Sequence, residues 1–143
     1  MTEPPARLQS TAELIPGLSA RLELTVTDAD TAQTLGSGDV PVLGTPRVLA
    51  LVEAATVAAT AARLGSGLTS VGTRVELEHL AATAVGRTVT AEAHLVDVDG
   101  RRLIFDVAVH DGDTVAAKGR VERTVVDRQR FLERVFGEGT FGG

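Results

Sequence analysis

The sequence predicts a single α+β domain in which one long helix packs on an antiparallel sheet. Residues 20–27 alternate between apolar and polar side chains, as a half-buried strand does. Residues 46–64 then form an apolar helical segment, and four further alternating segments follow it. At 143 residues the chain has the size of one domain, so we assign 1–143 to one unit, with an arm over 1–18 and a frayed Gly-rich tail over 137–143.

The first strand places Leu22, Leu24 and Val26 on one face. Residues 28–44, which are rich in Asp, Gly and Pro, indicate a long loop. Loops of this length are usually functional, so this segment is a candidate wall for a binding site.

The helix is expected to run from Pro46 to about Leu64. Thr45 is a favoured N-cap residue, and proline is favoured at the first helical position because its missing N–H has no partner there. The run Gly65-Ser66-Gly67 ends the helix. Its many Ala and Val residues and few charges predict that it is largely buried.

The remaining strands are predicted from the alternation of apolar and polar side chains and from the turn residues between them. They cover 70–79, 87–98, 101–110 and 114–126. Asp99-Gly100 favours a type I′ turn, and Asp111-Gly112-Asp113 favours a second turn. A short amphipathic helix follows over about 127–136. Long strands in a short chain leave sheet edges uncovered, which favours a dimer.

Composition excludes several kinds of function. The net charge of −5 leaves no basic excess for a nucleic-acid backbone. The absence of cysteine excludes disulfides, Fe–S clusters and a thiol nucleophile, and the three histidines lack metal-site spacing, so no metal is expected. Residues 1–20 do not resemble a signal peptide and no run of about 20 apolar residues exists, so we expect a cytoplasmic protein without membrane contact.

Glu53 is the only acidic residue between Val48 and Gly65. Its spacing to Thr56, Thr60 and Arg63 fits an ordinary polar stripe on a helix. A carboxylate in a partly apolar site is also suited to act as a general base or a nucleophile. The sequence leaves both interpretations open.

Other candidate residues lie on the strands. His79 has the apolar parity of its strand, as a core histidine or a catalytic one would. Arg123 interrupts an apolar series, so it either extends to solvent at the strand end or meets an anion in a cleft. Gly72 indicates a bulge or a close backbone approach. His94 and His110 share parity with polar neighbours and are expected at the surface.

Four segments together resemble a known family. They are Gly44-Thr45-Pro46-Arg47-Val48-Leu49-Ala50-Leu51-Val52-Glu53-Ala54-Ala55, Ser70-Val71-Gly72-Thr73-Arg74-Val75-Glu76-Leu77-Glu78-His79-Leu80-Ala81-Ala82-Thr83-Ala84-Val85-Gly86, Gly100-Arg101-Arg102-Leu103 and Val121-Glu122-Arg123. Over about residues 20–131 the chain resembles the fluoroacetyl-CoA-thioesterase-like branch of the hotdog-fold thioesterases.

This resemblance implies a fold and a site. The fold would be a hotdog fold, with a long buried helix on a curved antiparallel sheet. Two chains would pair into one continuous sheet, with the acyl-CoA site between them. The family's catalytic residues fall on Thr45, Glu53 and His79, and two residues that line its pocket fall on Gly72 and Arg123.

The implied activity is hydrolysis of an acyl-CoA thioester with a small acyl group. Glu53 would attack the carbonyl or activate water, and no cofactor would be needed beyond the coenzyme A of the substrate. In the family member that selects fluoroacetyl-CoA, phenylalanines cover the site. Residues 35–43 hold no aromatic side chain here, and we expect them to contact several short acyl groups through Val40, Val42 and Leu43. A hotdog hydratase acting on enoyl or 3-hydroxyacyl thioesters, and a non-catalytic acyl-CoA-binding protein, are the alternatives.

Overall fold

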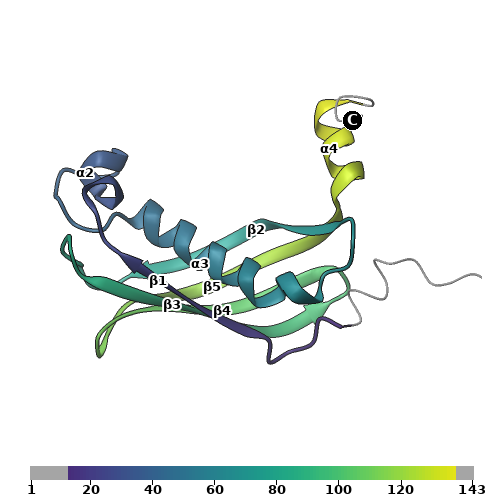
Figure 1. Cartoon of the computed structure of the whole chain (residues 1–143), viewed down its shortest axis with the longest axis horizontal. Coiled ribbons are helices and arrows are strands. Elements are labelled where there is room, and N and C mark those ends of the chain that lie inside the picture. Colours follow the sequence, from purple (N-terminus) through teal and green to yellow (C-terminus); the bar gives the residue numbers. More distant parts are fainter. Residues whose placement is uncertain (1–12, 138–143) are drawn as a thin grey trace, which may run out of the picture.

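A five-stranded antiparallel sheet carries one long helix across one of its faces (Figure 1). The computed structural model describes residues 13–137. The strands are β1 Ser19–Thr25, β2 Leu68–His79, β3 Thr88–Asp99, β4 Arg102–Asp111 and β5 Thr114–Asp127. Their order in the sheet is β1-β3-β4-β5-β2, so β2 forms one edge beside the last strand. The predicted α+β fold is confirmed, while most of the predicted arm and nearly all of the tail lie outside the described residues.

The predicted strands differ from the observed ones by at most two residues at either end. The turn between β3 and β4 differs from its predicted backbone geometry. Its central residues are Gly100 and Arg101, and Gly100 alone has a positive φ, of 62°. A type I′ turn needs positive φ at both positions, so that prediction is wrong, and glycine at the first position instead matches type II′.

The long helix, α3, spans Thr45–Thr60 and continues as a 3₁₀ turn, η2, over Ala61–Arg63. It packs against β1 and β3 through its buried side chains Val48, Leu51, Val52, Ala55 and Ala59. Its opposite face stays exposed, including Val57 at 45% and the small residues Ala50, Ala54 and Ala58. The expectation of a largely buried helix is therefore correct for one face only.

The start of α3 also differs from the prediction. Gly44, with φ −81° and ψ 145°, is the N-cap, and Thr45 is the first helical residue. A Cβ on Gly44 would lie 3.0 Å from the backbone of Ala32, so the chain passes too closely there for a side chain. Because glycine takes the cap position, the Thr45 hydroxyl is available for another contact.

The predicted loop over 28–44 contains two short helices, so that prediction is incomplete. They are the 3₁₀ turn η1, Asp28–Asp30, and α2, Ala32–Leu35 (Figure 1). Asp30 accepts hydrogen bonds from the Thr27 backbone at 2.8 Å and from Arg47 of α3 at 3.0 Å. Burial opposes ionisation of Asp30, but these contacts hold its pKa below the usual value. The loop is thereby tied to the helix.

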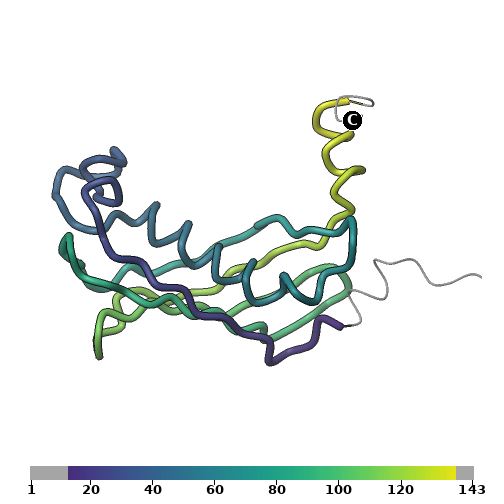
Figure 2. Tube along the Cα trace, in the orientation of Figure 1, coloured from purple at the N-terminus to yellow at the C-terminus, as the bar shows by residue number. Residues whose placement is uncertain are grey.

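The last helix, α4, spans Arg128–Phe136 and stands away from the sheet (Figures 1 and 2). The Asp127 side chain caps it by accepting a hydrogen bond from the Arg130 backbone at 3.1 Å. Within residues 13–137 no helix combines the length and apolar character needed to cross a bilayer.

Candidate active site

A bulge in β2 decides which of its side chains face α3. Pairing with β5 shifts register between Gly72 and Arg74, which leaves Thr73 as an extra residue. Gly72 pairs with Arg123 before the bulge, and Val75 pairs with Val121 after it. Because Arg123 and Val121 are both buried, positions before and after the bulge face the helix. The bulge predicted at Gly72 is confirmed.

Glu53 and Arg123 form an ion pair between α3 and the sheet. Arg123 Nη1 lies 3.2 Å from Glu53 Oε2, and the side chains are 7% and 35% exposed. Burial lowers the pKa of Arg123, and the charge and hydrogen bond of Glu53 oppose this. Arg123 therefore does not extend to solvent. The polar-stripe interpretation of the helix fails as well, because Thr56 and Thr60 are fully buried and their hydroxyls donate to helix carbonyls.

Ser70 holds the Arg123 guanidinium in place. Arg123 Nε donates to Ser70 Oγ at 2.8 Å, and Nη2 donates to the Ser70 carbonyl at 2.9 Å. Sequence reasoning missed this residue, because a serine in a strand carries no signal of its own. Gly72 completes the arrangement, since a Cβ built there would overlap Glu53 Oε2. The close approach predicted at Gly72 is thus made by a carboxylate.

Thr45 and His79 form a second polar pair. Thr45 Oγ1 lies 2.8 Å from His79 Nδ1, and joins the first residue of α3 to the last residue of β2. His79 Nε2 is buried. Burial lowers the pKa of His79 and a hydrogen bond with the Ala81 backbone partly opposes it, so the ring is neutral near pH 7. A neutral imidazole can accept a proton.

A cavity of about 300 Å³ lies beside this second pair. Thr45 and His79 line it together with the predicted contact residues Val40, Val42 and Leu43. Its remaining lining residues are Ala32, Ser37, Gly38, Leu80, Ala81 and Ala82. The segment after His79 was not predicted to line a site, although its position directly behind a candidate histidine is a usable signal.

The predicted site residues therefore fall into two groups within one chain. Glu53 lies with Gly72 and Arg123, whereas Thr45 lies with His79 and the cavity. Glu53 lies eight positions after Thr45 on the helix, a rise of about 12 Å. No hydrogen bond or ion pair joins the two groups in the part of the chain that the structure describes. In residues 13–137 no three His, Asp or Glu side chains cluster as metal ligands would.

Comparisons with known proteins assign the chain to a family. Residues 26–129 match the family described as "Fluoroacetyl-CoA-specific thioesterase". The fluoroacetyl-CoA thioesterase of Streptantibioticus cattleyicolor is 40% identical over 94 residues, which cover 66% of this chain and 68% of that protein.

Solved structures give the same result. A mutant of the fluoroacetyl-CoA thioesterase FlK in complex with acetyl-CoA superposes with a TM-score of 0.82 at 32% identity, covering 88% of this chain and 99% of that one. A hot-dog-like protein from Thermanaerovibrio acidaminovorans superposes with a TM-score of 0.81 at 28% identity, covering 93% and 97%. The chain therefore has the hotdog fold and belongs to the fluoroacetyl-CoA-specific thioesterase family.

Proposed function

We propose that this protein hydrolyses acyl-CoA thioesters with small acyl groups. The observation that carries the proposal is the Thr45–His79 hydrogen bond beside a cavity of about 300 Å³ with apolar walls. Such a cavity accommodates a short acyl chain, and the neutral histidine supplies a base next to it. Membership of a thioesterase family supports the same reaction class.

The start of α3 supplies the electrophilic half of the proposed site. The Thr45 N–H lies in the first turn, where backbone donors have no partner within the helix, and Pro46 has no N–H at all. The positive end of the helix dipole lies there too. These groups would stabilise the oxyanion that forms when the thioester carbonyl is attacked. The thiolate of coenzyme A then leaves and takes up a proton.

His79 and Glu53 would share the remaining chemistry. His79 would position water and move its proton. Glu53 would act as nucleophile, through a transient mixed anhydride, or as general base. Arg123 would hold the Glu53 carboxylate while Gly72 leaves room for it. No cofactor is required, because water is the second substrate.

The separation of the two groups leads us to place the site between two copies of the chain. The free edge of β2 and the exposed small-residue face of α3 (Ala50, Ala54 and Ala58) are surfaces that a homodimer would cover. Two-fold pairing of β2 strands is antiparallel. It would bring His79 of one copy toward the start of the partner's β2, beside which the partner's Glu53 lies.

A screen of acyl-CoA substrates would identify the acyl group. We expect turnover of several short acyl-CoAs with little preference for fluoroacetyl over acetyl, since residues 35–43 contain no aromatic side chain. A thiol reagent that reports released coenzyme A measures this directly. Binding without thiol release would instead identify a non-catalytic acyl-CoA-binding protein, and water addition to an enoyl thioester would identify a hydratase.

Glu53→Gln tests the mechanism. Turnover should fall at least about a hundredfold, the low end of general-base contributions. His79→Ala should also slow turnover, and the double variant should be little worse than the worse single one, because residues that act as a unit are not additive. Glu53→Gln also removes the counter-ion of a buried guanidinium, so we expect about 1–3 kcal/mol of destabilisation.

The control is Glu76→Gln, which removes a carboxylate that is 64% exposed. It should change stability by less than about 0.5 kcal/mol and leave kcat/KM unchanged. Measuring kcat/KM and Tm on the same preparations separates catalysis from folding. A folded Glu53→Gln protein with near-native turnover would remove Glu53 from the mechanism.

A further inference from the structure

Arginines without a carboxylate partner gather at one end of the sheet. On the strands and at the start of α3, arginines pair with Asp or Glu side chains: Arg21, Arg47, Arg74, Arg87, Arg102, Arg120 and Arg123. Among the described residues Arg63, Arg101, Arg128, Arg130 and Arg134 have no such pair. This is unexpected in a chain of net charge −5, in which carboxylates outnumber cations.

Three of these arginines line one cleft. Its volume is about 230 Å³, and its lining includes Arg101 from the β3–β4 turn with Arg130 and Arg134 from α4. Arg130 and Arg134 are four residues apart, so they share one face of the helix. The cleft contains one carboxylate, that of Asp127, which already accepts the hydrogen bond that caps α4. The cleft therefore has an excess of positive charge.

The backbone that carries these arginines is anchored. Val125 N donates to Arg101 O at 2.8 Å, which fixes the β3–β4 turn to β5. Arg128 N donates to Gly67 O at 2.9 Å, which fixes the start of α4 to the segment before β2. Although α4 stands away from the sheet (Figure 1), its first turn is held against it. The guanidinium groups are thus exposed on a fixed frame.

We infer that the cleft lined by Arg101, Arg130 and Arg134 binds phosphate groups, and that the nucleotide end of the acyl-CoA substrate supplies them. Planar guanidinium groups match phosphate oxygens through paired hydrogen bonds. This inference rests on the proposed function, since it assigns the charged half of that substrate. It adds a site that is separate from the cavity at His79.

The position of the cleft fits an extended substrate. Thr124 lines it and directly follows Arg123, whose side chain contacts Glu53. Asp127 lies four residues beyond Arg123, about 13 Å along β5 at roughly 3.3 Å per residue. In coenzyme A the phosphates lie on the nucleotide, separated from the thioester by a long flexible arm. The cleft is at the end of β5 toward which such an arm would extend from Glu53.

Two thioesters of the same acyl group test the inference. One is the acyl-CoA, and the other is the acyl N-acetylcysteamine thioester, which lacks the nucleotide. In the Arg130→Gln/Arg134→Gln variant, and in Arg101→Gln, we expect KM for the acyl-CoA to rise about tenfold or more while kcat is kept. The value of kcat/KM for the short thioester should stay within about twofold.

Arg128→Gln is the matched control. It removes the same charge from the same helix, but Arg128 lines a different hollow beside Gly67 and Leu132. Its kinetics should match those of the unsubstituted protein. These arginines are exposed, and melting curves of all variants confirm folding.

Direct binding to the full-length protein, measured by calorimetry, identifies the source of the phosphate. We expect 3′-phosphoadenosine 5′-diphosphate to bind, to bind more weakly as salt is raised, and to lose at least tenfold in affinity in the double variant. Inorganic phosphate that binds as tightly as the nucleotide would assign the cleft to a free anion and overturn the substrate assignment. Unchanged nucleotide affinity in the variants, or equal kinetic losses with both thioesters, would overturn the site itself. If neither thioester is hydrolysed, the proposed function fails, while calorimetry still decides whether the cleft binds the nucleotide.

Discussion

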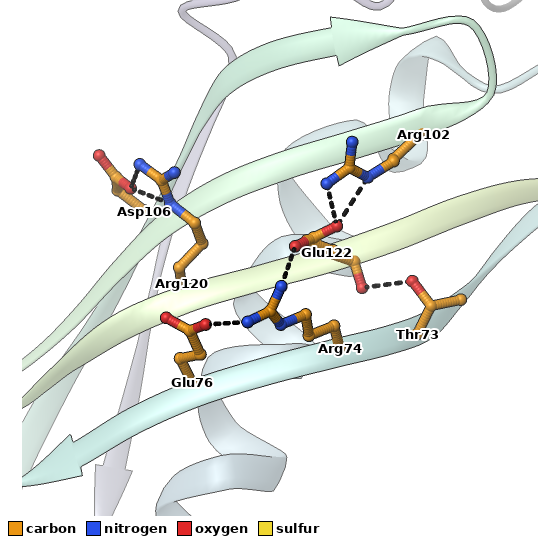
Figure 3. Close-up of polar contacts among 7 residues, drawn as sticks. All are labelled: Thr73, Arg74, Glu76, Arg102, Asp106, Arg120 and Glu122. Atoms are coloured by element: carbon orange, nitrogen blue, oxygen red, sulfur yellow. Dashed lines mark hydrogen bonds and ion pairs between the residues drawn. The ribbon is translucent and has the colours of Figure 1, made fainter.

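The two faces of the sheet use ion pairs in opposite ways. The face covered by α3 holds one pair, Glu53–Arg123, in which the arginine side chain is 7% exposed. The other face carries a network of pairs: Arg74 with Glu76 and Glu122, Arg102 with Glu122, and Arg120 with Asp106 (Figure 3). The arginines of this network are about half exposed or more. The arginines of the two faces thus lie in very different environments.

This difference in burial determines how much each ion pair contributes to stability. Solvent stabilises the charges of Arg74–Glu76 and Arg120–Asp106 with or without their partners, so each of these two pairs contributes between about 0 and 1 kcal/mol. Glu122 differs, because its side chain is 12% exposed and relies on Arg74 and Arg102 to balance its charge. The buried guanidinium has lost its water, and its stability depends on Glu53, on Ser70 and on the space at Gly72. The inner pair should therefore be sensitive to single atoms, and the pairs Arg74–Glu76 and Arg120–Asp106 should not.

Gly72→Ala should have the largest effect. The new methyl group would overlap Glu53 Oε2, so the carboxylate must move away from Arg123. We expect a loss of about 1–3 kcal/mol in stability, as for other overpacked sites, and a fall of about a hundredfold in kcat/KM. Kinetics and melting curves measure both.

Combining Gly72→Ala with Glu53→Gln shows whether Gly72 acts through the carboxylate. The double variant should be little slower than Glu53→Gln alone. Additive losses would mean that Gly72 contributes to activity independently of Glu53.

Ser70→Ala should have a smaller effect. It removes the acceptor of Arg123 Nε but leaves the Ser70 carbonyl in place for Nη2. A buried charged donor without a partner costs about 1–3 kcal/mol, and a less well oriented Arg123 should lower kcat/KM about tenfold. Ser70→Thr keeps a hydroxyl and should restore both quantities. Failure of threonine to restore kcat/KM, with stability recovered, would separate the packing of Ser70 from its hydrogen bond.

His79 should give a pH dependence that the outer face lacks. Burial lowers its pKa from the ordinary value of 6.5. Well above pH 6.5 the ring is neutral in both the folded and the unfolded protein, so it does not affect stability there. Below pH 6.5 the unfolded state binds more protons, and the free energy of unfolding should fall as the pH drops toward the folded pKa.

His79→Gln should remove this part of the stability profile, which denaturant unfolding at a series of pH values measures. Its counterpart is His94→Gln, at a side chain that is 56% exposed and so is not removed from water by folding. An identical profile in both variants would contradict a burial-driven shift at His79.

Arg120→Gln should have the smallest effect. Its contact with Asp106, at 3.1 Å, joins two side chains that are each more than half exposed. We expect a change in stability below about 1 kcal/mol that decreases further with added salt, and no change in kcat/KM. A larger loss would show that the outer network acts cooperatively.

Local sequence signals predicted the elements well. Alternation predicted β3, β4 and β5 because one face of each strand is buried, as Leu103, Phe105 and Val107 on β4 show. The glycine within β2 correctly indicated a bulge and a close contact. The family resemblance implied one site with Thr45, Glu53, His79, Gly72, Arg123, Val40, Val42 and Leu43. Within one chain the structure groups Thr45, His79 and the three loop residues around one cavity and leaves Glu53, Gly72 and Arg123 outside it.

Other features required the folded chain. The N-cap at Gly44 depends on the nearby backbone of Ala32, which overrides the preference for threonine. The exposed face of α3 shows that the apolar composition of a helix does not predict how much of its surface is buried within one chain.

The sequence by itself determined the strands, the long helix and the residue types available for chemistry, because alternation, helical periodicity and turn residues act between near neighbours. Only the tertiary structure decided which of these side chains contact one another. Arg123 meets Glu53 across 70 positions of sequence and Ser70 across 53, and Thr45 meets His79 across 34. Such contacts depend on strand register, on a single bulge and on the path of α3 over the sheet, and these are set by the packing of the whole core.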